Sequence, residues 1–247
     1  MQDPLKNVMV TLPTYNESEN IEKICLTVFE RYPGIKIVVI DDNSPDRTWE
    51  IVEKLKKNWP NLFLIRRLDQ KGRGTAGRDG FLFALQEGAQ FIIEMDADFS
   101  HNPRYIAEML NVAAEDKVVI GSRLVPGGGE VGRNPVRRWI TLMANWYIRI
   151  VLGLKIRDCT SGYRMFPRNI LKKIDLESLS STGPEIVQEI LYRCRIVGAE
   201  FCEIPILFEE RAAGTSTFNV KIMIRSLFFV LSLRFSNKFD PPAESHV

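Results

Sequence analysis

The sequence predicts an α/β fold in which helices cover a doubly wound, mostly parallel sheet. In the first 120 residues, five short segments rich in β-branched and other apolar residues alternate with four longer segments of helical apolar spacing. Strands that are joined through helices form parallel sheets with right-handed crossovers. At 247 residues, the chain is also long enough to bury a substantial core within one domain.

The first two strand–helix units are predicted from apolar runs and their spacing. Residues 8–12 are apolar and β-branched and predict a strand, and residues 17–30 carry five apolar side chains at helical intervals. A second strand over 35–40 is followed by a helix over 48–55. The five helical positions are Ile21, Ile24, Cys25, Val28 and Phe29.

Three further strands and two helices complete this half. The predicted segments are a strand over 62–65, a helix over 75–86, a strand over 91–95, a helix over 104–114 and a strand over 118–120.

The pattern changes after Gly121. Residues 126–129 (PGGG) predict a flexible loop, and basic residues lead from it into an aromatic-rich helix over 139–154. We predict a disordered tail over 237–247, which contains two adjacent prolines.

Composition excludes several classes of protein. The 33 basic and 31 acidic residues nearly balance, so general nucleic-acid binding has no support. Four dispersed cysteines and two histidines argue against zinc and against a disulfide framework, and they fit a reducing compartment. The first residues lack the apolar core of a signal peptide, and no segment reaches the length of a membrane span. We therefore expect an intracellular protein.

Asp96-Ala97-Asp98 follows the fourth predicted strand and is the strongest chemical signal in the chain. The carboxyl end of a strand is where open α/β sheets bind ligands, and paired carboxylates suit Mg²⁺ or Mn²⁺ held on a substrate phosphate. Taken alone, the triplet is equally consistent with an acidic turn that caps the helix after Pro103.

The other strand ends are also polar. PTYNE (13–17) follows the first strand and DDNSPD (41–46) follows the second, which suits a nucleotide, although capping is the simpler role for Asn16, Ser44 and Asp46. The glycine-rich basic segment 71–77 either approaches phosphates or is a flexible loop, because it matches no standard phosphate-binding pattern.

Together these segments resemble glycosyltransferase family 2, and most closely its dolichyl- or polyprenyl-phosphate mannose synthase branch. The resemblance runs from residue 13 to about residue 217. Its markers are PTYNE (13–17), DDNSPD (41–46), DADFSH (96–101), GSR (121–123), RRxxT (137–141), DxTSGYR (158–164), EIPI (203–206) and EERxxGxS (209–216).

The resemblance implies a Rossmann-like GT-A domain and assigns roles to individual residues. Asp96 and Asp98 would hold the donor ribose and a Mg²⁺ or Mn²⁺ ion, with Ser100 as a third metal position, while Arg123 and Arg211 would bind the donor phosphates. Asp98, Arg123 and Arg211 would be the catalytic residues. Pro13, Tyr15, Glu17 and Asp42 would line the nucleoside pocket.

The acceptor implied by the family is a lipid phosphate, which needs no catalytic base. Its second pKa lies near 6, so it is largely an oxyanion at neutral pH. We accordingly leave Asp158 and Glu210 out of that role. Family analogy selects Arg137 and Thr141 from the basic helix start as the phosphate seat, and an ordinary solvated surface is the alternative.

Two apolar helices are candidates to meet the lipid. Residues 139–154 and 218–235 combine apolar and aromatic residues with flanking arginines, which is typical of helices lying in a membrane interface. Core packing or dimer formation is the alternative for each helix. The predicted boundaries are a catalytic domain over 1–217, an interfacial helix over 218–236 and the tail over 237–247.

The chain also departs from the family pattern. Many relatives have a G-L-G-T-A-Y loop where this chain has GRGTAG (72–77), and many have Lys where Thr217 stands. Some relatives carry Gln at the position of Ser100. These differences weaken predictions about donor contacts.

The predicted reaction is metal-dependent, inverting transfer of a hexosyl group, with mannose from GDP-mannose preferred, to polyprenyl or dolichyl phosphate. UDP-glucose is the alternative donor, and a non-enzymatic membrane-binding module is the alternative from another class. A nucleotidyltransferase is disfavoured because its glycine-rich signature after the first strand is missing. We expect a peripheral protein on the cytoplasmic face of a membrane, acting alone, as a homodimer or with an anchoring subunit.

Overall fold

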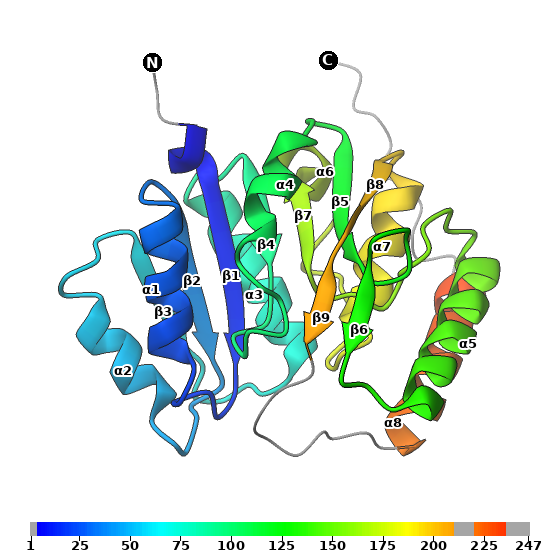
Figure 1. Ribbon diagram of the computed structural model, residues 1–247, viewed down its shortest axis with the longest axis horizontal. Helices are drawn as coiled ribbons and strands as arrows, with labels where there is room; N and C mark the ends of the chain where they lie inside the picture. The colour runs from blue at the N-terminus through cyan, green and yellow to red at the C-terminus, as the bar shows by residue number, and fades with distance from the viewer. Residues whose placement is uncertain (1–3, 210–219, 236–247) are drawn as a thin grey trace.

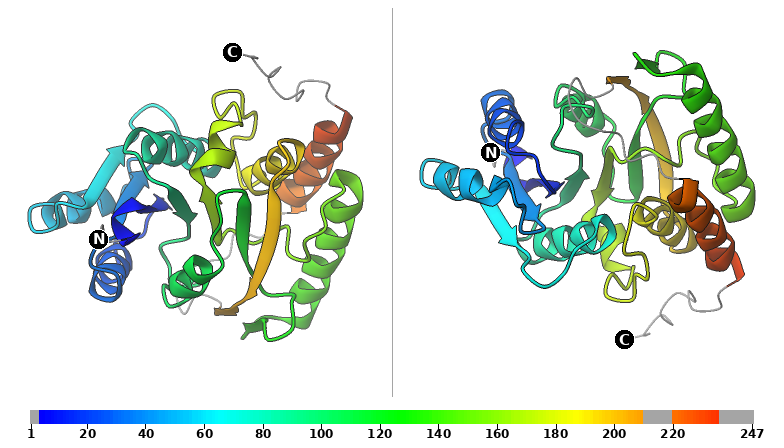
Figure 2. Two further views of the ribbon diagram at one scale, coloured as in Figure 1. Left: turned by 90° about the horizontal axis from the view of Figure 1, so that it is seen from above. Right: turned by 90° about the horizontal axis from the view of Figure 1, so that it is seen from below.

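A seven-stranded sheet runs through the centre of the protein and has helices on both faces (Figures 1 and 2). The computed structural model describes residues 4–209 and 220–235. The strands of this sheet are β1 (Val8–Thr14), β2 (Lys36–Asp41), β3 (Leu62–Arg66), β4 (Phe91–Glu94), β5 (Lys117–Ser122), β7 (Arg164–Pro167) and β8 (Glu200–Pro205). Their order across the sheet is β3-β2-β1-β4-β7-β5-β8.

The sheet is mostly parallel, as the sequence predicts, and β7 is its antiparallel strand. β7 lies between β4 and β5 and runs opposite to both, so that Glu94 pairs in register with Arg164. β6 (Gly129–Val131) and β9 (Leu207–Glu209) form a separate two-stranded parallel sheet. The four strands β6 to β9 were not predicted, because they lie in the half of the chain without regular strand–helix alternation.

Eight α-helices and a short 3-10 helix, Pro4–Asn7, accompany the strands within the described residues. The helices are α1 (Ile21–Arg31), α2 (Thr48–Leu55), α3 (Arg73–Gln86), α4 (Tyr105–Asn111), α5 (Pro135–Leu152), α6 (Arg168–Lys172), α7 (Ile186–Ile196) and α8 (Val220–Phe235). α2 has its predicted bounds. α5 begins four residues before the predicted Trp139, because the Asn134 side chain accepts a hydrogen bond from the Val136 N–H at 2.8 Å and Pro135 suits the first helical position.

Alternation along the strands divides the core between the two faces. In β1, Val8 and Leu12 pack with α1, α2 and α4, whereas Met9 packs with α3 and α7. This is the period of two expected of a strand that is buried on both sides. Figure 2 shows the two helical layers on opposite sides of the sheet.

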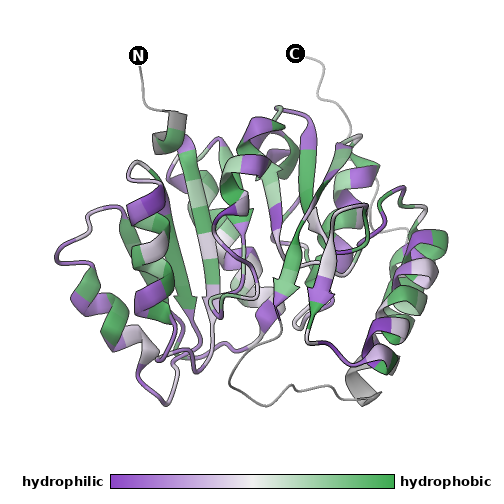
Figure 3. Cartoon of the chain, in the orientation of Figure 1, coloured by the Kyte–Doolittle hydropathy of each residue, from purple (hydrophilic) through white to green (hydrophobic). Residues whose placement is uncertain are grey.

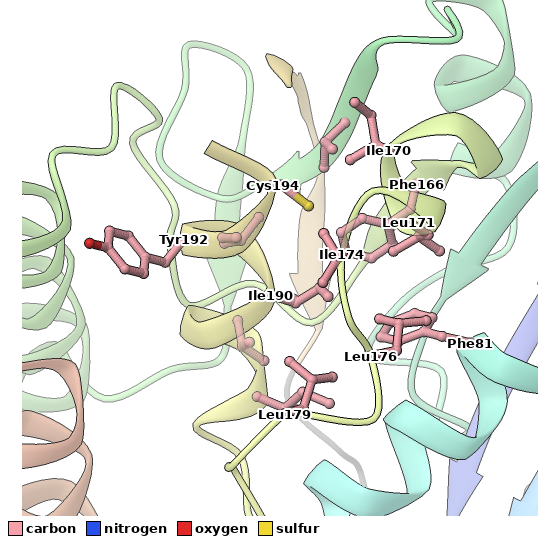
Figure 4. Packing of buried hydrophobic residues seen from close by; sticks show 14 of the residues in the cluster. Phe81, Phe166, Ile170, Leu171, Ile174, Leu176, Leu179, Ile190, Tyr192 and Cys194 are labelled. Atoms are coloured by element: carbon pink, nitrogen blue, oxygen red, sulfur yellow. The ribbon is translucent and has the colours of Figure 1, made fainter. Parts of the chain in front are cut away.

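The face that carries α3, α6 and α7 is closed by aliphatic and aromatic side chains. Figure 4 shows Ile174 and Leu176 between α7 and the side chains around Phe81, while Tyr192 projects from α7 away from this group. Phe81 and Phe166 meet edge to face, with their ring centroids 5.3 Å apart. This packing fixes α3, whose first turn lies at the candidate site.

α5 and α8 form a helical pair beside α7 (Figure 1). The Tyr147 hydroxyl of α5 donates to the Leu227 carbonyl oxygen of α8 at 2.9 Å. α5 keeps six large apolar side chains exposed, namely Val136, Trp139, Leu142, Met143, Trp146 and Ile150. Apolar and polar residues are interspersed along the helix (Figure 3). Among residues 4–209 and 220–235, no helix combines the length and apolar character needed to cross a bilayer.

Candidate active site

The candidate site lies at the carboxyl ends of β1, β2 and β4. The loops that follow these strands contain non-glycine residues with left-handed backbone, namely Asn16 (φ 61°), Asn43 (φ 52°) and Phe99 (φ 64°). Such conformations cost about 1–3 kcal/mol each and persist where surrounding contacts enforce them, which is common at functional sites. Three neighbouring strand ends therefore share this strained, polar geometry.

The loop after β2 is built by its own side chains. Fully buried Asp41 accepts hydrogen bonds from the Thr14 hydroxyl (2.9 Å) and the Ser44 hydroxyl (2.7 Å). Asp46 accepts from the Thr48 hydroxyl at 2.6 Å and from the Ser18 N–H at 2.9 Å. Burial would raise the pKa of Asp46, but these hydrogen bonds outweigh it and lower the pKa. Ser44 and Asp46 thus hold the loop together through its own groups, whereas the N-cap residue of α2 is Arg47, which makes no side-chain capping hydrogen bond.

The residues predicted to line a nucleoside pocket lie at this edge of the sheet. Pro13 is in β1, Tyr15 follows it with half of its surface exposed, and Glu17 is buried. The Lys71 ammonium lies 5.8 Å from the centroid of the Tyr15 ring. The exposed ring offers a flat surface on which a base could stack.

Asp42 is held by contacts that sequence reasoning missed. Arg67, itself buried, donates from Nε to Asp42 Oδ1 at 2.7 Å, and the Gly72 N–H donates to Asp42 Oδ2, also at 2.7 Å. Arg67 Nη1 reaches Asp79 on α3 at 3.1 Å. The same guanidinium therefore fixes Asp42 relative to the first turns of α3.

The glycine-rich segment 71–77 forms the start of α3 and is not a flexible loop. Its first two glycines face protein backbone and not an open phosphate site. A Cβ on Gly72 would lie 2.3 Å from the Thr182 carbonyl oxygen, and one on Gly74 would lie 2.4 Å from the Ser181 carbonyl oxygen. The Gly74 N–H donates to the Thr182 carbonyl oxygen at 3.0 Å. These glycines allow the segment before α7 to cover the start of α3.

Asp96 and Asp98 follow β4 as predicted. The Asp96 side chain is one-third exposed, whereas Asp98 is 9% exposed. Asp98 Oδ1 accepts from the Ser100 hydroxyl at 2.6 Å and from the Ser100 N–H at 3.0 Å. Ser100, the predicted third metal position, thus fixes Asp98 within the loop.

His101 supports the same loop from behind. Its Nδ1 accepts the Asp96 N–H at 2.9 Å, and its ring stacks on Tyr163 with centroids 5.1 Å apart. Burial lowers the pKa of His101, and this outweighs the opposing effect of Asp96. A neutral His101 with Nδ1 as acceptor agrees with this hydrogen bond.

The pair Asp96 and Asp98 fits a divalent ion that arrives with phosphate. Two carboxylates are a normal protein contribution for Mg²⁺, which keeps waters and takes substrate phosphate oxygens as further ligands. Within the described residues, no group of three or more His, Cys, Asp or Glu side chains could hold a metal ion by itself. The donor set therefore suits a metal shared with a diphosphate.

A buried chain of alternating charges leads to Asp96. Arg164 of β7 binds Glu94 of β4, both fully buried, and Arg73 binds Glu94 at 2.5 Å and Asp96 at 3.2 Å. Burial would raise the pKa of Glu94, but the two guanidinium groups outweigh it and hold the pKa below its ordinary value. Glu94 escaped sequence analysis because it ends an apolar run; Arg73 stood in the basic segment 71–77 but had no partner assigned.

Arg123 lies at the end of β5, where its guanidinium is already paired. It donates to the two carboxylate oxygens of Asp158 at 2.7 Å each and to the Thr160 hydroxyl at 2.6 Å. Its Nη1 is 3.3 Å from Glu130, which also binds Arg133. Phosphate binding by Arg123 stays a prediction, and any such contact would use the edge of the guanidinium left beside this pair.

A cavity of about 270 Å³ opens beside Arg123, between α5, α7 and α8. Its polar lining is Arg123, Arg133, Thr141, Thr160, Gln188 and Ser226. Thr141 was predicted, but the arginine of the basic helix start that lines the cavity is Arg133, while the predicted Arg137, half-buried on the first turn of α5, is not part of the lining. The apolar lining is Ile140, Ala144, Ile148, Pro184, Leu227 and Val230.

Arg211, the remaining predicted site residue, lies outside the described residues, as do Glu210 and the boundary at residue 217.

Comparison of the sequence with known protein families identifies one that matches most of the chain. The model of glycosyl transferase family 2 matches residues 9–175, a segment that contains the three strand ends and both carboxylates of the DAD triplet. The chain belongs to glycosyl transferase family 2. It is therefore a glycosyltransferase, as the motifs predicted.

Two relatives indicate the branch of the family to which the chain is most similar. Polyprenol monophosphomannose synthase of Mycolicibacterium smegmatis is 36% identical over 240 residues, which cover 96% of this chain and 90% of the relative. Undecaprenyl-phosphate mannosyltransferase of Micrococcus luteus is 34% identical over 209 residues, covering 85% and 86%. The resemblance to the lipid-phosphate mannosyltransferase branch is confirmed.

Solved structures agree on the fold. Glucosyl-3-phosphoglycerate synthase from Mycobacterium tuberculosis, in complex with Mn²⁺, uridine diphosphate and glucosyl-3-phosphoglycerate, superposes with a TM-score of 0.64 at 14% identity. The superposition covers 92% of this chain and 78% of that one. The predicted GT-A fold is confirmed, and at this level of identity the likeness concerns the fold alone.

Proposed function

We propose that this glycosyltransferase moves a mannosyl group from GDP-mannose to a polyprenyl or dolichyl phosphate, with inversion and with a divalent metal. The observation that carries the proposal is the cavity beside Arg123, whose lining combines two guanidinium groups and three hydroxyls with apolar side chains of α5 and α8. A phosphate on an isoprenoid chain has the same division into an anionic head and an apolar tail. The two mannosyltransferase relatives support the same acceptor class and sugar.

The chemistry requires one bond to form and one to break at the sugar. An oxygen of the acceptor phosphate attacks the anomeric carbon, and the bond from that carbon to the donor diphosphate breaks on the opposite face, which inverts the configuration. The acceptor oxygen is already ionised at neutral pH, so Arg133 and Thr141 need only orient it. A base is not required, and the pairing of Asp158 with Arg123 agrees with a structural role for that carboxylate.

Asp96 and Asp98 would hold Mg²⁺ or Mn²⁺. When bound, such an ion neutralises the charge on the departing diphosphate. On the protein side, Ser100 and His101 keep the loop that carries the two carboxylates in place. Tyr15, with Pro13, Glu17 and Asp42 around it, would take the nucleoside.

UDP-glucose is the second candidate donor. Neither Asp41 nor Asp42 distinguishes guanine from uracil, because the bonds described for both carboxylates are to the protein's own groups. The names of the two relatives favour mannose.

The outer side of α5 would rest on the membrane surface. Its exposed apolar residues recur every three or four positions, so they form one stripe, and α8 adds exposed Phe228 and Phe235 beside it. Arg138 and Arg149, also exposed on α5, would meet anionic headgroups. In this arrangement the cavity would lie close to the lipid that carries the acceptor phosphate, and the enzyme would be peripheral on the cytoplasmic face. A homodimer or an anchoring subunit is the alternative cover for this stripe.

Transfer assays with labelled donors test the proposal. Purified protein is given GDP-mannose, UDP-glucose or other GDP- and UDP-sugars with dolichyl phosphate, in Mn²⁺, in Mg²⁺ or with chelator. We expect mannosyl transfer from GDP-mannose that chelator abolishes, and loss of at least 1,000-fold in rate for Asp98→Ala. Transfer that is indifferent to chelator would refute the metal mechanism, and transfer from UDP-glucose alone would replace the donor. A non-enzymatic membrane module predicts no transfer, with membrane binding unchanged by Asp98→Ala.

A further inference from the structure

We propose that the Arg73 guanidinium stays paired with Asp96 as long as no donor is bound. Through this ion pair, Arg73 would make the binding of a divalent metal depend on the donor diphosphate. This inference rests on the proposed role of Asp96 and Asp98 in holding a metal. It concerns a residue of the basic segment 71–77 to which the family resemblance assigned no role.

The position of Arg73 is enforced from behind. Its Nη1 donates to Glu94 Oε1 at 2.5 Å, and its Nη2 donates to Asp96 Oδ1 at 3.2 Å. Glu94 is fully buried and is bound on its other oxygen by Arg164, so it is a fixed anchor. Because one prong is tied to this anchor, the guanidinium is held against Asp96.

Two glycines leave room for the guanidinium. A Cβ on Gly77, one turn along α3, would lie 3.2 Å from Glu94 Oε1 and 3.6 Å from Arg73 Nη1. A Cβ on Gly162 would lie 3.5 Å from Arg73 Nη2. A large side chain at position 77 would compete for this space. Arg73 and Gly77 therefore form a matched pair in this chain.

The charge of Arg73 acts in opposite directions on the two ligands. With Asp96 and Asp98 ionised, the guanidinium reduces the local charge from −2 to −1 and repels a free divalent ion. A diphosphate adds negative charge and is attracted by the same guanidinium. Metal binding without nucleotide should thus be weak, and nucleotide binding without metal should remain measurable.

Mn²⁺ binding to the free protein tests this directly, with electron paramagnetic resonance as the readout. We expect Arg73→Met to bind Mn²⁺ at least tenfold more tightly than the wild type in the absence of nucleotide. Arg73→Lys, which keeps the charge, should stay within threefold of the wild type. Lys54→Met, which removes a positive charge from an exposed position of α2, is the control and should also match the wild type. Unchanged or weaker Mn²⁺ binding by Arg73→Met overturns the proposal, as does Arg73→Lys binding as tightly as Arg73→Met.

The second arm measures GDP binding by calorimetry, with chelator and with Mn²⁺. In chelator, Arg73→Met should bind GDP at least tenfold more weakly than the wild type. The gain in GDP affinity on adding Mn²⁺ should be smaller in the variant, because metal and diphosphate then depend less on each other. Equal GDP affinity of both proteins in chelator contradicts the proposal. If neither the wild type nor Arg73→Met binds GDP, UDP replaces GDP as the probe. A wrong donor assignment would leave the Mn²⁺ comparison unaffected, because that comparison uses no nucleotide. Arg73→Met leaves Glu94 paired with Arg164, so the variant should fold.

Discussion

Arg123 and Asp158 form a two-point ion pair in which Nε and Nη2 each donate to a different carboxylate oxygen at 2.7 Å. Asp158 is fully buried and Arg123 lines the cavity between α5, α7 and α8. The pair thus joins the end of β5 to the loop after α5 and sets the direction of the guanidinium at the cavity.

Replacing Asp158 with Asn should destabilise the protein by about 3 kcal/mol, because removal of one charge leaves the other buried without its counter-ion. The free energy of unfolding in urea measures this. Asp69→Asn, at an exposed position, is the control and should change the stability by less than about 0.5 kcal/mol. Equal stability of the two variants would mean that the pair contributes nothing.

The same pair predicts a pH dependence. Burial would raise the pKa of Asp158, but the hydrogen bonds and charge of Arg123 outweigh it and lower the pKa in the folded state. Its stabilisation is therefore present above the unfolded pKa of about 3.9 and is lost as the pH falls from there through the folded value. In urea titrations, the stability difference between the wild type and Asp158→Asn should be constant from pH 7 to 5 and shrink below about pH 4. A difference that grows on acidification would reverse the sign assigned to the shift.

Gly74→Ala should disturb the start of α3. The new Cβ would lie 2.4 Å from the Ser181 carbonyl oxygen, which is backbone and cannot rotate away, so we expect a loss of about 1–3 kcal/mol in the free energy of unfolding. Gly129→Ala is the matched control, since its Cβ would make only an ordinary contact of 3.4 Å with Leu207. Similar effects of both substitutions would show that the close approach at Gly74 is unimportant.

The basic start of α5 offers a test of the acceptor site. Arg133→Ala removes a guanidinium from the cavity and should raise the KM for polyprenyl phosphate at least tenfold while leaving the donor KM within twofold. Arg137→Ala should have a smaller effect, because Arg137 does not line the cavity. The reverse order of the two effects would restore Arg137 as the acceptor contact that family analogy selected.

The exposed tryptophans of α5 should control membrane binding. Trp139→Ser with Trp146→Ser should weaken partition into vesicles containing anionic lipid at least tenfold, because the two side chains are 63% and 59% exposed in the structure and form part of one apolar stripe. Sedimentation with vesicles measures the partition. Leu68→Ser, at another exposed apolar position, should leave it unchanged. Unaltered vesicle binding of the double variant, together with a loss of dimer, would assign the stripe to a protein interface.

The sequence by itself determined the regular half of the fold and the carboxylates. Val8 and Met9 fall on opposite faces because strands alternate with period two, and apolar runs of this kind are local signals. The position of Asp96 and Asp98 after β4 follows from the same local pattern, since a strand of known direction carries its C-terminal residues to a known edge.

The tertiary structure alone decided the partners. Arg164 on the antiparallel strand β7, Glu94 on β4 and Arg73 on α3 are separated by up to 91 positions, and nothing local indicates that they meet. The same holds for Gly74, whose lack of a side chain serves the Ser181 carbonyl oxygen rather than a phosphate. Long-range packing places these groups together, because ion pairs and close approaches depend on distances that only the folded chain sets.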